Sequence, residues 1–164
     1  MTAHAMRALA REAFLHAVAE AGVGKAFARH VHYDRGVLRI CDDLYDLRSY
    51  ARVLVVSFGK AGHAMAEALA SQTGSAIGGI VADPNQQAIQ IPGYRYFQGG
   101  HPHPNEESLR AASAILKSLS ALNSQSLALF MISGVLYSCA TITASLMKLT
   151  KSFIHSGRVP WILG

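Results

Sequence analysis

Val53-Leu-Val-Val56 leads directly into Ser57-Phe-Gly-Lys-Ala-Gly62, which is followed by His63-Ala-Met-Ala-Glu-Ala-Leu-Ala70. The first four residues are typical of a buried strand, and the last eight favour a helix. The six residues between them therefore form a tight strand-to-helix turn that carries Lys60. Backbone N–H groups at a helix start attract an anion, and the Lys60 ammonium adds a positive charge there. The stretch predicts a phosphate-handling site.

The same turn has a plainer interpretation, in which it only joins strand to helix and Lys60 is solvated. It is not a Walker A loop, because the spacing of the glycines differs and Ala61 has no oxygen to offer Mg²⁺. A GxGxxG pattern is also absent after this strand, which argues against a dinucleotide-binding oxidoreductase.

Further strands and helices alternate on both sides of this turn. We expect an amphipathic packing helix from Arg7, broken near Gly22 and Gly24, with its apolar side formed by Ala10, Phe14, Ala17, Val18 and Ala21. The expected strands are 52–57, 78–82, 94–97 and 127–132, and 37–40 is a short strand or an approach segment. This alternation predicts a three-layer αβα, Rossmann-like domain with a mainly parallel sheet.

A proline-containing loop, residues 99–107, precedes the last expected helix. Asn105 is placed to cap that helix, and Glu106 and Glu107 complement its dipole. The helix should end near residue 119. Its expected buried side is formed by Leu109, Ala112, Ile115, Leu116 and Leu119.

Composition limits the function classes. The chain has 164 residues, of which 51% are hydrophobic and 15% charged, which is typical of one globular domain with large buried surfaces. The formal net charge is +5, but no basic cluster interleaved with aromatic residues occurs, so nucleic acid is not an expected partner. Cys41 and Cys139 are isolated, which excludes a sequence-local metal motif and favours a reduced, cytoplasmic protein.

Leu127 to Met147 has the length of a membrane span and contains no charged residue. Short polar interruptions such as Ser133-Gly134 divide it, however, so we expect a buried strand, a loop and a helix at about 142–156 instead. No membrane association is therefore predicted. The acid-free segment 135–164 is expected to differ from the α/β domain formed by residues 1–134.

Several separated motifs together resemble the glycerate 2-kinase family, whose second domain is often called MOFRL and some of whose members also carry the name hydroxypyruvate reductase. The opening helix Arg11-Glu-Ala-Phe-Leu-His-Ala-Val18 is followed by the strand and Gly-Lys-Ala turn of residues 53–62. Gly100-His-Pro-His-Pro-Asn-Glu-Glu107 resembles the family's Gly-His-Pro-x-Pro-Asp-Glu, and Leu129-Phe-Met-Ile-Ser-Gly134 resembles its strand entering a Ser-Gly-Gly loop.

The resemblance implies ATP-dependent phosphoryl transfer to the 2-hydroxyl of D-glycerate, giving 2-phosphoglycerate, with Mg²⁺ and a cleft between two α/β domains. It implies that Lys60 is the catalytic lysine. It also implies that Gly59, Gly62, Ser133 and Gly134 face nucleotide or substrate, with His101 as a further substrate contact. For Ser133 and His101 a purely structural role in their loops remains the alternative.

The sequence departs from the family pattern after Gly134, where Val135-Leu-Tyr-Ser-Cys139 replaces further glycines. Bulky side chains there hinder close approach of the backbone to a phosphate. The family's second domain has no counterpart in the 164 residues, so the expected function is the N-terminal portion of a glycerate 2-kinase, inactive alone. The alternatives are a non-catalytic remnant that forms a homo-oligomer and, less favoured, an NAD-dependent hydroxypyruvate reductase.

Overall fold

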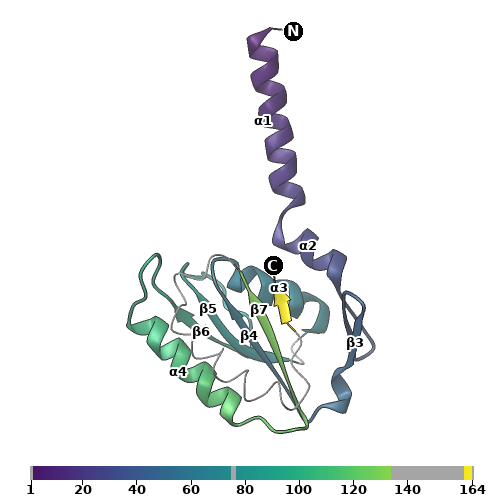
Figure 1. Ribbon diagram of the computed structural model, residues 1–164, viewed down its shortest axis with the longest axis vertical. Coiled ribbons are helices and arrows are strands. Elements are labelled where there is room, and N and C mark those ends of the chain that lie inside the picture. Colours follow the sequence, from purple (N-terminus) through teal and green to yellow (C-terminus); the bar gives the residue numbers. More distant parts are fainter. Residues whose placement is uncertain (1, 75–76, 134–160, 164) are drawn as a thin grey trace.

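The computed structural model describes residues 2–74, 77–133 and 161–163. Its main sheet has the strand order β6-β5-β4-β7-β8, and all four pairings between neighbours are parallel (Figure 1). The strands are β4 (Arg52–Phe58), β5 (Gly78–Asp83), β6 (Tyr94–Gln98), β7 (Ser126–Ile132) and the short β8 (Trp161–Leu163). The strands expected near residues 52, 78, 94 and 127 are therefore confirmed.

Two helices cover opposite faces of this sheet. Helix α3 (Gly62–Thr73) packs through Met65, Ala66 and Leu69 against the face that includes Val55, Val81 and Leu129. Helix α4 (Glu106–Ser120) packs against the other face, which includes Leu54, Val56 and Phe130. Neighbouring residues of β4 thus belong to different halves of the core, as the period of two along a strand requires. The three-layer αβα architecture with a parallel sheet is confirmed.

Helix α4 begins as expected from its cap. The side chain of Asn105 accepts a hydrogen bond from the Ser108 backbone N–H at 2.9 Å, and the Ser108 hydroxyl accepts one from the Asn105 N–H at 3.3 Å. Leu109 is expected on the buried side but is 53% exposed, and Leu116 is half-buried. Ala112, Ile115 and Leu119 are buried as expected, and Ser108 and Ala111 are buried in addition.

A second, smaller sheet precedes the main one, and the sequence predicts it only in part. It is antiparallel, with strands β1 (Val31–Asp34), β2 (Val37–Ile40) and β3 (Asp43–Asp46), and is followed by the 3-10 helix η1 (Leu47–Ser49). Helix α2 (Val23–His30) leads into it. Gln72 of α3 anchors the first strand, since its side chain accepts from the Tyr33 N–H and donates to the Val31 carbonyl.

Helix α1 (Ala3–Glu20) differs from its expected role as a packing helix. It extends away from the rest of the molecule (Figure 1), and none of its residues is buried. Phe14 and Val18, two of the side chains expected to pack, are 66% and 54% exposed. The helix itself is confirmed, but the described residues place no core against it.

No helix in the described ranges is long and apolar enough to cross a bilayer. Within the apolar stretch from Leu127 to Met147, residues 127–132 belong to the buried strand β7. The rest of that stretch beyond Ser133, the helix expected at 142–156, and nearly all of the segment 135–164 lie outside the described residues.

Candidate functional site

The carboxyl ends of four parallel strands lie at one edge of the main sheet, and the predicted site residues follow them. Lys60 comes after β4 and Ser133 directly after β7, while the loop containing His101 follows β6. Asp83 is the last residue of β5. In open α/β sheets this edge is where ligands bind, so the topology brings the sequence-predicted residues to the expected place.

Gly59 allows the turn after β4 to pass close to the end of β7. Its φ of +105° lies in the region that side chains disfavour, and a Cβ built on it would lie 1.9 Å from the Ser133 carbonyl oxygen. The Gly59 N–H donates to the Ala82 carbonyl at 3.1 Å, which ties the same turn to β5. Glycine is therefore required here by both conformation and space.

Ser133 is held against the Lys60 turn by two hydrogen bonds. Its backbone N–H donates to the Phe58 carbonyl at 3.0 Å, which continues the β4–β7 pairing by one residue. Its hydroxyl oxygen accepts from the Ala61 N–H at 2.7 Å. The hydroxyl can also donate one hydrogen bond, and it donates to no other described residue, so Ser133 combines a structural role with a donor that a ligand can use.

The start of α3 retains donors for an anion. Ser57 donates its hydroxyl to the Gly62 carbonyl at 2.6 Å, and the Gly62 N–H donates to the Gly59 carbonyl at 2.9 Å. Among the described residues, the N–H groups of Lys60 and Ala64 have no acceptor, and the exposed Lys60 ammonium has neither hydrogen bond nor ion pair. Two amides, an ammonium and the Ser133 hydroxyl can therefore meet a negatively charged group.

Asp83 is a buried carboxylate of this edge that the sequence reasoning did not single out. It is only 2% exposed, and one of its oxygens accepts from the His63 N–H at 3.0 Å. The other oxygen accepts from the backbone and side-chain N–H groups of Asn85 at 2.8 and 3.1 Å. An acidic residue at the end of an apolar strand, next to Pro84-Asn85, was the available signal.

Tyr96 of β6 fixes the orientation of His63. Its hydroxyl accepts from the Ile91 N–H at 3.2 Å and lies 2.9 Å from His63 Nδ1. The His63 and Tyr96 rings also lie close together, with their centroids 5.8 Å apart. Burial raises the pKa of Tyr96, and the charges of Glu67 and Asp83 act in the same direction.

Of the remaining predicted site residues, only Gly62 is hydrogen-bonded to the Lys60 turn among the described residues. Gly62 is buried in the first turn of α3. His101 is exposed and precedes a cis peptide bond to Pro102, and no hydrogen bond joins its side chain to another described residue. It shares the sheet edge with Lys60, but β5 lies between their strands. Gly134 lies outside the described residues.

The donor set fits a phosphate group better than a metal ion. Lys60 and the free amides are the kind of groups that bind phosphoryl oxygens. The described residues contain no group of three or more His, Cys, Asp or Glu side chains that could hold a metal. Both oxygens of Asp83 accept hydrogen bonds from N–H groups, which hold this carboxylate in place at the end of β5.

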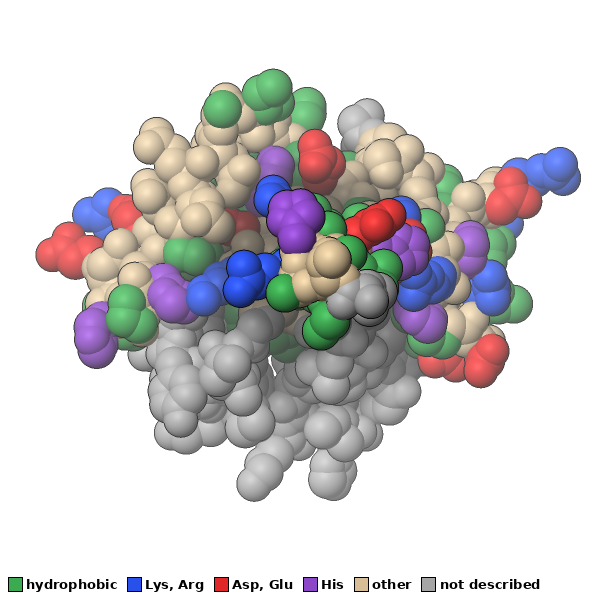
Figure 2. All heavy atoms as spheres, turned by 90° about the horizontal axis from the view of Figure 1, so that it is seen from above, with side chains coloured by type: hydrophobic (Ala, Val, Ile, Leu, Met, Phe, Trp, Pro, Cys, Tyr) green, Lys and Arg blue, Asp and Glu red, His purple; other side chains and the backbone are tan. Residues whose placement is uncertain are grey.

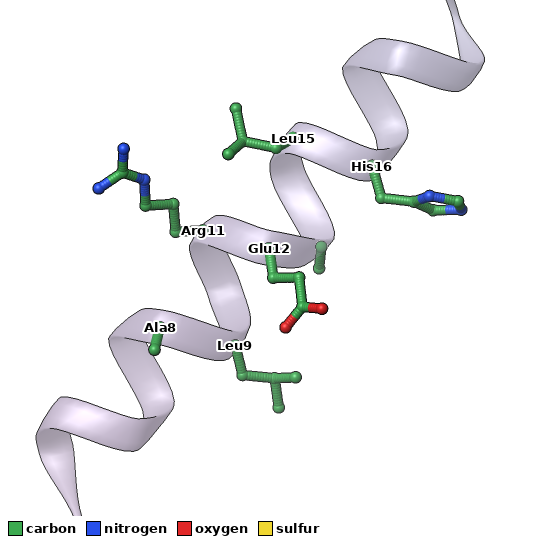
Figure 3. Close-up of a pocket in the computed structure, with 7 residues that line it drawn as sticks. Ala8, Leu9, Arg11, Glu12, Leu15 and His16 are labelled. Carbon is green, nitrogen blue, oxygen red and sulfur yellow. The ribbon is translucent and has the colours of Figure 1, made fainter.

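A shallow hollow elsewhere on the surface is not a second site of this kind. It is lined by Ala8, Leu9, Arg11, Glu12, Ala13, Leu15 and His16, all of them in α1. Figure 3 shows that Arg11 and His16 point to opposite sides of that helix. The hollow is therefore the exposed surface of one helix, and its side chains do not converge on a ligand.

Comparison with known proteins supports the family resemblance. The family described as "Domain of unknown function (DUF4147)" matches residues 9–153. A D-glycerate 2-kinase of Thermotoga maritima is 30% identical over 114 residues, covering 65% of this chain. The match covers 27% of that relative, so the chain spans about a quarter of its length. The resemblance to glycerate 2-kinases is confirmed at this level.

Two crystal structures share the fold. A protein of Pyrococcus horikoshii OT3 matches 90% of this chain and 36% of its own, with a TM-score of 0.64 and 22% identity. The glycerate kinase of Thermotoga maritima matches 94% of this chain and 36% of its own, with a TM-score of 0.62 and 22% identity. On the match to residues 9–153, the chain belongs to the DUF4147 family.

Proposed function

We propose that this chain forms the Lys60-bearing part of an ATP-dependent glycerate 2-kinase. The reaction transfers the γ-phosphoryl group of ATP to the 2-hydroxyl of D-glycerate and gives 2-phosphoglycerate. The observation that carries the proposal is the contact between the Lys60 turn and the end of β7, in which the Ser133 hydroxyl accepts from the Ala61 N–H. The relative named as a D-glycerate 2-kinase supplies the substrate class.

The Lys60 turn suits phosphoryl transfer for a physical reason. Charge accumulates on the transferred group, and catalysis consists mainly of holding donor and acceptor in line and offsetting that charge. Lys60 offers a charge on a long side chain, whereas its own N–H and that of Ala64 are fixed by the helix start. The Ser133 hydroxyl adds a donor from the neighbouring strand.

ATP binds in this proposal through its phosphates to the Lys60 turn, and Gly59 permits that turn's close approach to β7. Mg²⁺ would enter with the nucleotide, since the described residues supply no ligand set of their own for it. His101, exposed at the same edge, is proposed to contact the carboxylate of glycerate. Gly134, which follows Ser133 in the sequence, is proposed as a further contact for nucleotide or substrate.

We further propose that residues 1–134 form an α/β domain of glycerate kinase type and that residues 135–164 form a divergent apolar C-terminal segment, of which the described part, β8, joins the main sheet beside β7. The chain matches only 27% of the D-glycerate 2-kinase relative. A kinase active site excludes water when it closes around its substrates, so turnover in this proposal requires more polypeptide than this chain alone. We expect nucleotide binding without measurable phosphoglycerate formation by the isolated chain. A cytoplasmic location is part of the same proposal.

Calorimetric titration with ATP tests the role of Lys60. Lys60→Ala should weaken ATP binding about tenfold or more, which corresponds to losing about 1.4 kcal/mol from one charge-assisted contact. Lys117→Ala removes an exposed lysine from α4 and is the matched control, with unchanged affinity expected. Equal binding by wild type and Lys60→Ala contradicts the proposed site.

A coupled assay for 2-phosphoglycerate tests the reaction itself. The unmatched part of the Thermotoga maritima relative is supplied in trans to wild type and to Lys60→Ala. Formation of 2-phosphoglycerate that depends on Lys60 supports the kinase. ATP binding without lysine-dependent turnover, even in the mixture, leaves the non-catalytic alternative as the better description of this chain.

A further inference from the structure

The proposed phosphoryl transfer requires a proton acceptor, and neither Lys60 nor Ser133 supplies one. When the 2-hydroxyl of glycerate bonds to the γ-phosphorus, its proton passes to another group. Lys60 and Ser133 act as donors in the proposed site. The Asp83 carboxylate is 2% exposed, which keeps it out of reach of a substrate hydroxyl. A ring nitrogen of histidine is the most frequent acceptor for such a proton.

His63 is the histidine that the fold holds next to the Lys60 turn. Figure 2 shows histidine side chains at the surface among acidic and basic ones, so exposure alone does not single one out. Among the described histidines, only His63 is half-buried, and it lies in the first turn of α3. Asp83 accepts from its backbone N–H at 3.0 Å, and the Tyr96 hydroxyl lies 2.9 Å from its Nδ1. Two neighbouring strands therefore fix this residue.

The second ring nitrogen of His63 is available to a ligand. Nδ1 lies beside the Tyr96 hydroxyl, whereas no hydrogen bond joins Nε2 to another described residue. The Tyr96 hydroxyl accepts from the Ile91 N–H at 3.2 Å, and its oxygen has a second lone pair that can accept from an Nδ1–H. In that arrangement the ring carries its proton on Nδ1, and Nε2 is a free acceptor.

The strand order places His63 on one side of the Lys60 turn and Ser133 on the other. The contacts of His63 are made with β6 and the end of β5, and β6 leads into the loop that carries His101. Ser133 follows β7, on the far side of β4. A phosphoryl group bound by Lys60 then lies between Ser133 and His63. The acceptor hydroxyl belongs on the His63 side, since His101 is the proposed contact for the glycerate carboxylate.

We infer that His63 accepts the proton of the glycerate 2-hydroxyl and that Tyr96 positions its ring for this step. The hydroxyl oxygen bonds to the γ-phosphorus, and the hydroxyl proton moves to Nε2. The bond from that phosphorus to the bridging oxygen breaks, and its electron pair stays on ADP. His63 becomes an imidazolium, which returns the proton to water after the product leaves. This inference rests on the proposed kinase function.

The titratable groups around His63 come from α3, β5, β6 and the Lys60 turn. Glu67 lies one turn further along α3, Asp83 ends β5, and Tyr96 belongs to β6. Burial raises the pKa of Tyr96, with smaller contributions from the charges of Glu67 and Asp83, so its hydroxyl stays neutral. The ring is then the group that changes its charge near neutral pH. A bound phosphate beside Nε2 adds negative charge, which favours the imidazolium.

Two-bond ¹H–¹⁵N NMR spectra of the full chain test the arrangement of the ring. At about pH 8, where histidine rings are neutral, His63 of the wild type should carry its proton on Nδ1. Tyr96→Phe removes the accepting oxygen and should give a mixture of both tautomers. The signals that disappear in His63→Gln identify the ring. A wild-type ring with its proton on Nε2 overturns the inference.

Titration calorimetry in buffers of different ionisation enthalpy tests the contact with the reacting group. The probe is 2-phosphoglycerate, because it represents the state in which the proton has moved to Nε2. Its binding at about pH 7.5 should take up about half a proton or more per complex in the wild type, and much less in His63→Gln. His32→Gln changes an exposed histidine of β1 whose side chain bonds to no other described residue, and should match the wild type.

The outcomes separate the role of His63 from the proposed function. Lys60-dependent binding of ATP, with equal proton uptake by wild type and His63→Gln, overturns the role of His63 and leaves the kinase proposal standing. The same holds if ATP binds and 2-phosphoglycerate does not. Binding of neither ligand contradicts the proposed function, and the role of His63 is lost with it. Proton uptake that only His63→Gln abolishes, together with the Nδ1 tautomer, supports His63 as the acceptor.

Discussion

Gly59 is the residue on which the geometry of the candidate site depends most directly. Its positive φ turns the chain out of β4, and its missing side chain leaves room for the Ser133 carbonyl. A single methyl group here would force apart the two loops that hold Lys60 and Ser133. The site and the local stability of the sheet edge are thus coupled through one position.

We predict that Gly59→Ala lowers the free energy of unfolding by about 2 to 4 kcal/mol, from backbone strain and overpacking together. Urea denaturation measures this change. Gly24→Ala is the matched control, because Gly24 lies in α2 and a Cβ there would meet nothing within 4 Å. The control should leave stability unchanged or raise it by up to about 1 kcal/mol.

The sequence predicted where several single site residues lie, but not all of their hydrogen-bond partners. Lys60, Gly59 and Ser133 could be placed from strand ends, because the carboxyl ends of parallel strands share one edge. Asp83 and Tyr96 could not be assigned their partners. Their hydrogen bonds to His63 join residues 20 and 33 positions apart, and no local spacing encodes such contacts.

At the scale of elements, α4 shows how a short capping motif defines a helix start. Asn105 accepts from the Ser108 N–H and also donates its side-chain N–H to the Gln98 carbonyl at 3.2 Å, linking the helix to β6. The cap was predictable because it needs only residues three positions apart. The displacement of Leu109 to the surface was not, since the sheet decides which side of the helix is buried.

We predict that Asn105→Ala lowers the unfolding free energy by about 1 kcal/mol, with a range of about 0.5 to 2, through loss of the cap. Thermal and urea denaturation provide the measurement. Gln86→Ala is the control, because Gln86 is exposed and hydrogen-bonds to no other described residue. An unchanged midpoint in Asn105→Ala would show that the Ser108 N–H finds an equivalent acceptor.

The two outer strands of the small sheet were not predicted, for a different reason. Strands β1 and β3 carry mixed polar and apolar residues, and their pairing with β2 depends on the turns at Arg35-Gly36 and Cys41. Arg35 and Cys41 both have positive φ, which would not be predicted from their residue types. For α1 the period was clear, but periodicity alone does not say whether a partner is present.

For the whole molecule, the buried Tyr94 side chain makes stability depend on alkaline pH. Burial raises the pKa of Tyr94 to about 12 from 10.0, and its hydroxyl has no hydrogen-bond partner among the described residues. The folded state therefore retains the phenolic proton at pH values where the unfolded chain loses it. The contribution to stability is complete below pH 10 and disappears as the pH rises toward 12.

We predict a loss of up to about 2 to 3 kcal/mol of stability between pH 10 and 12 from this one group. Tyr94→Phe should remove that part of the loss and be neutral or slightly stabilising at pH 7, because it deletes an unpaired buried hydroxyl. Denaturation midpoints across the pH range measure both effects. A variant as sensitive to alkali as the wild type contradicts this assignment.

The pairing of β4 with β7 has a consequence for the order in which the protein forms during synthesis. Ala61 and the Ser133 hydroxyl that it binds are 72 positions apart, and the helix α4 lies between them in the chain. The Lys60 turn can therefore emerge from the ribosome long before its support exists. A nascent chain that ends short of Ser133 exposes one side of β4 as an unpaired edge, and such edges bind other chains. The Lys60 turn is thus among the last parts of this sheet to be secured.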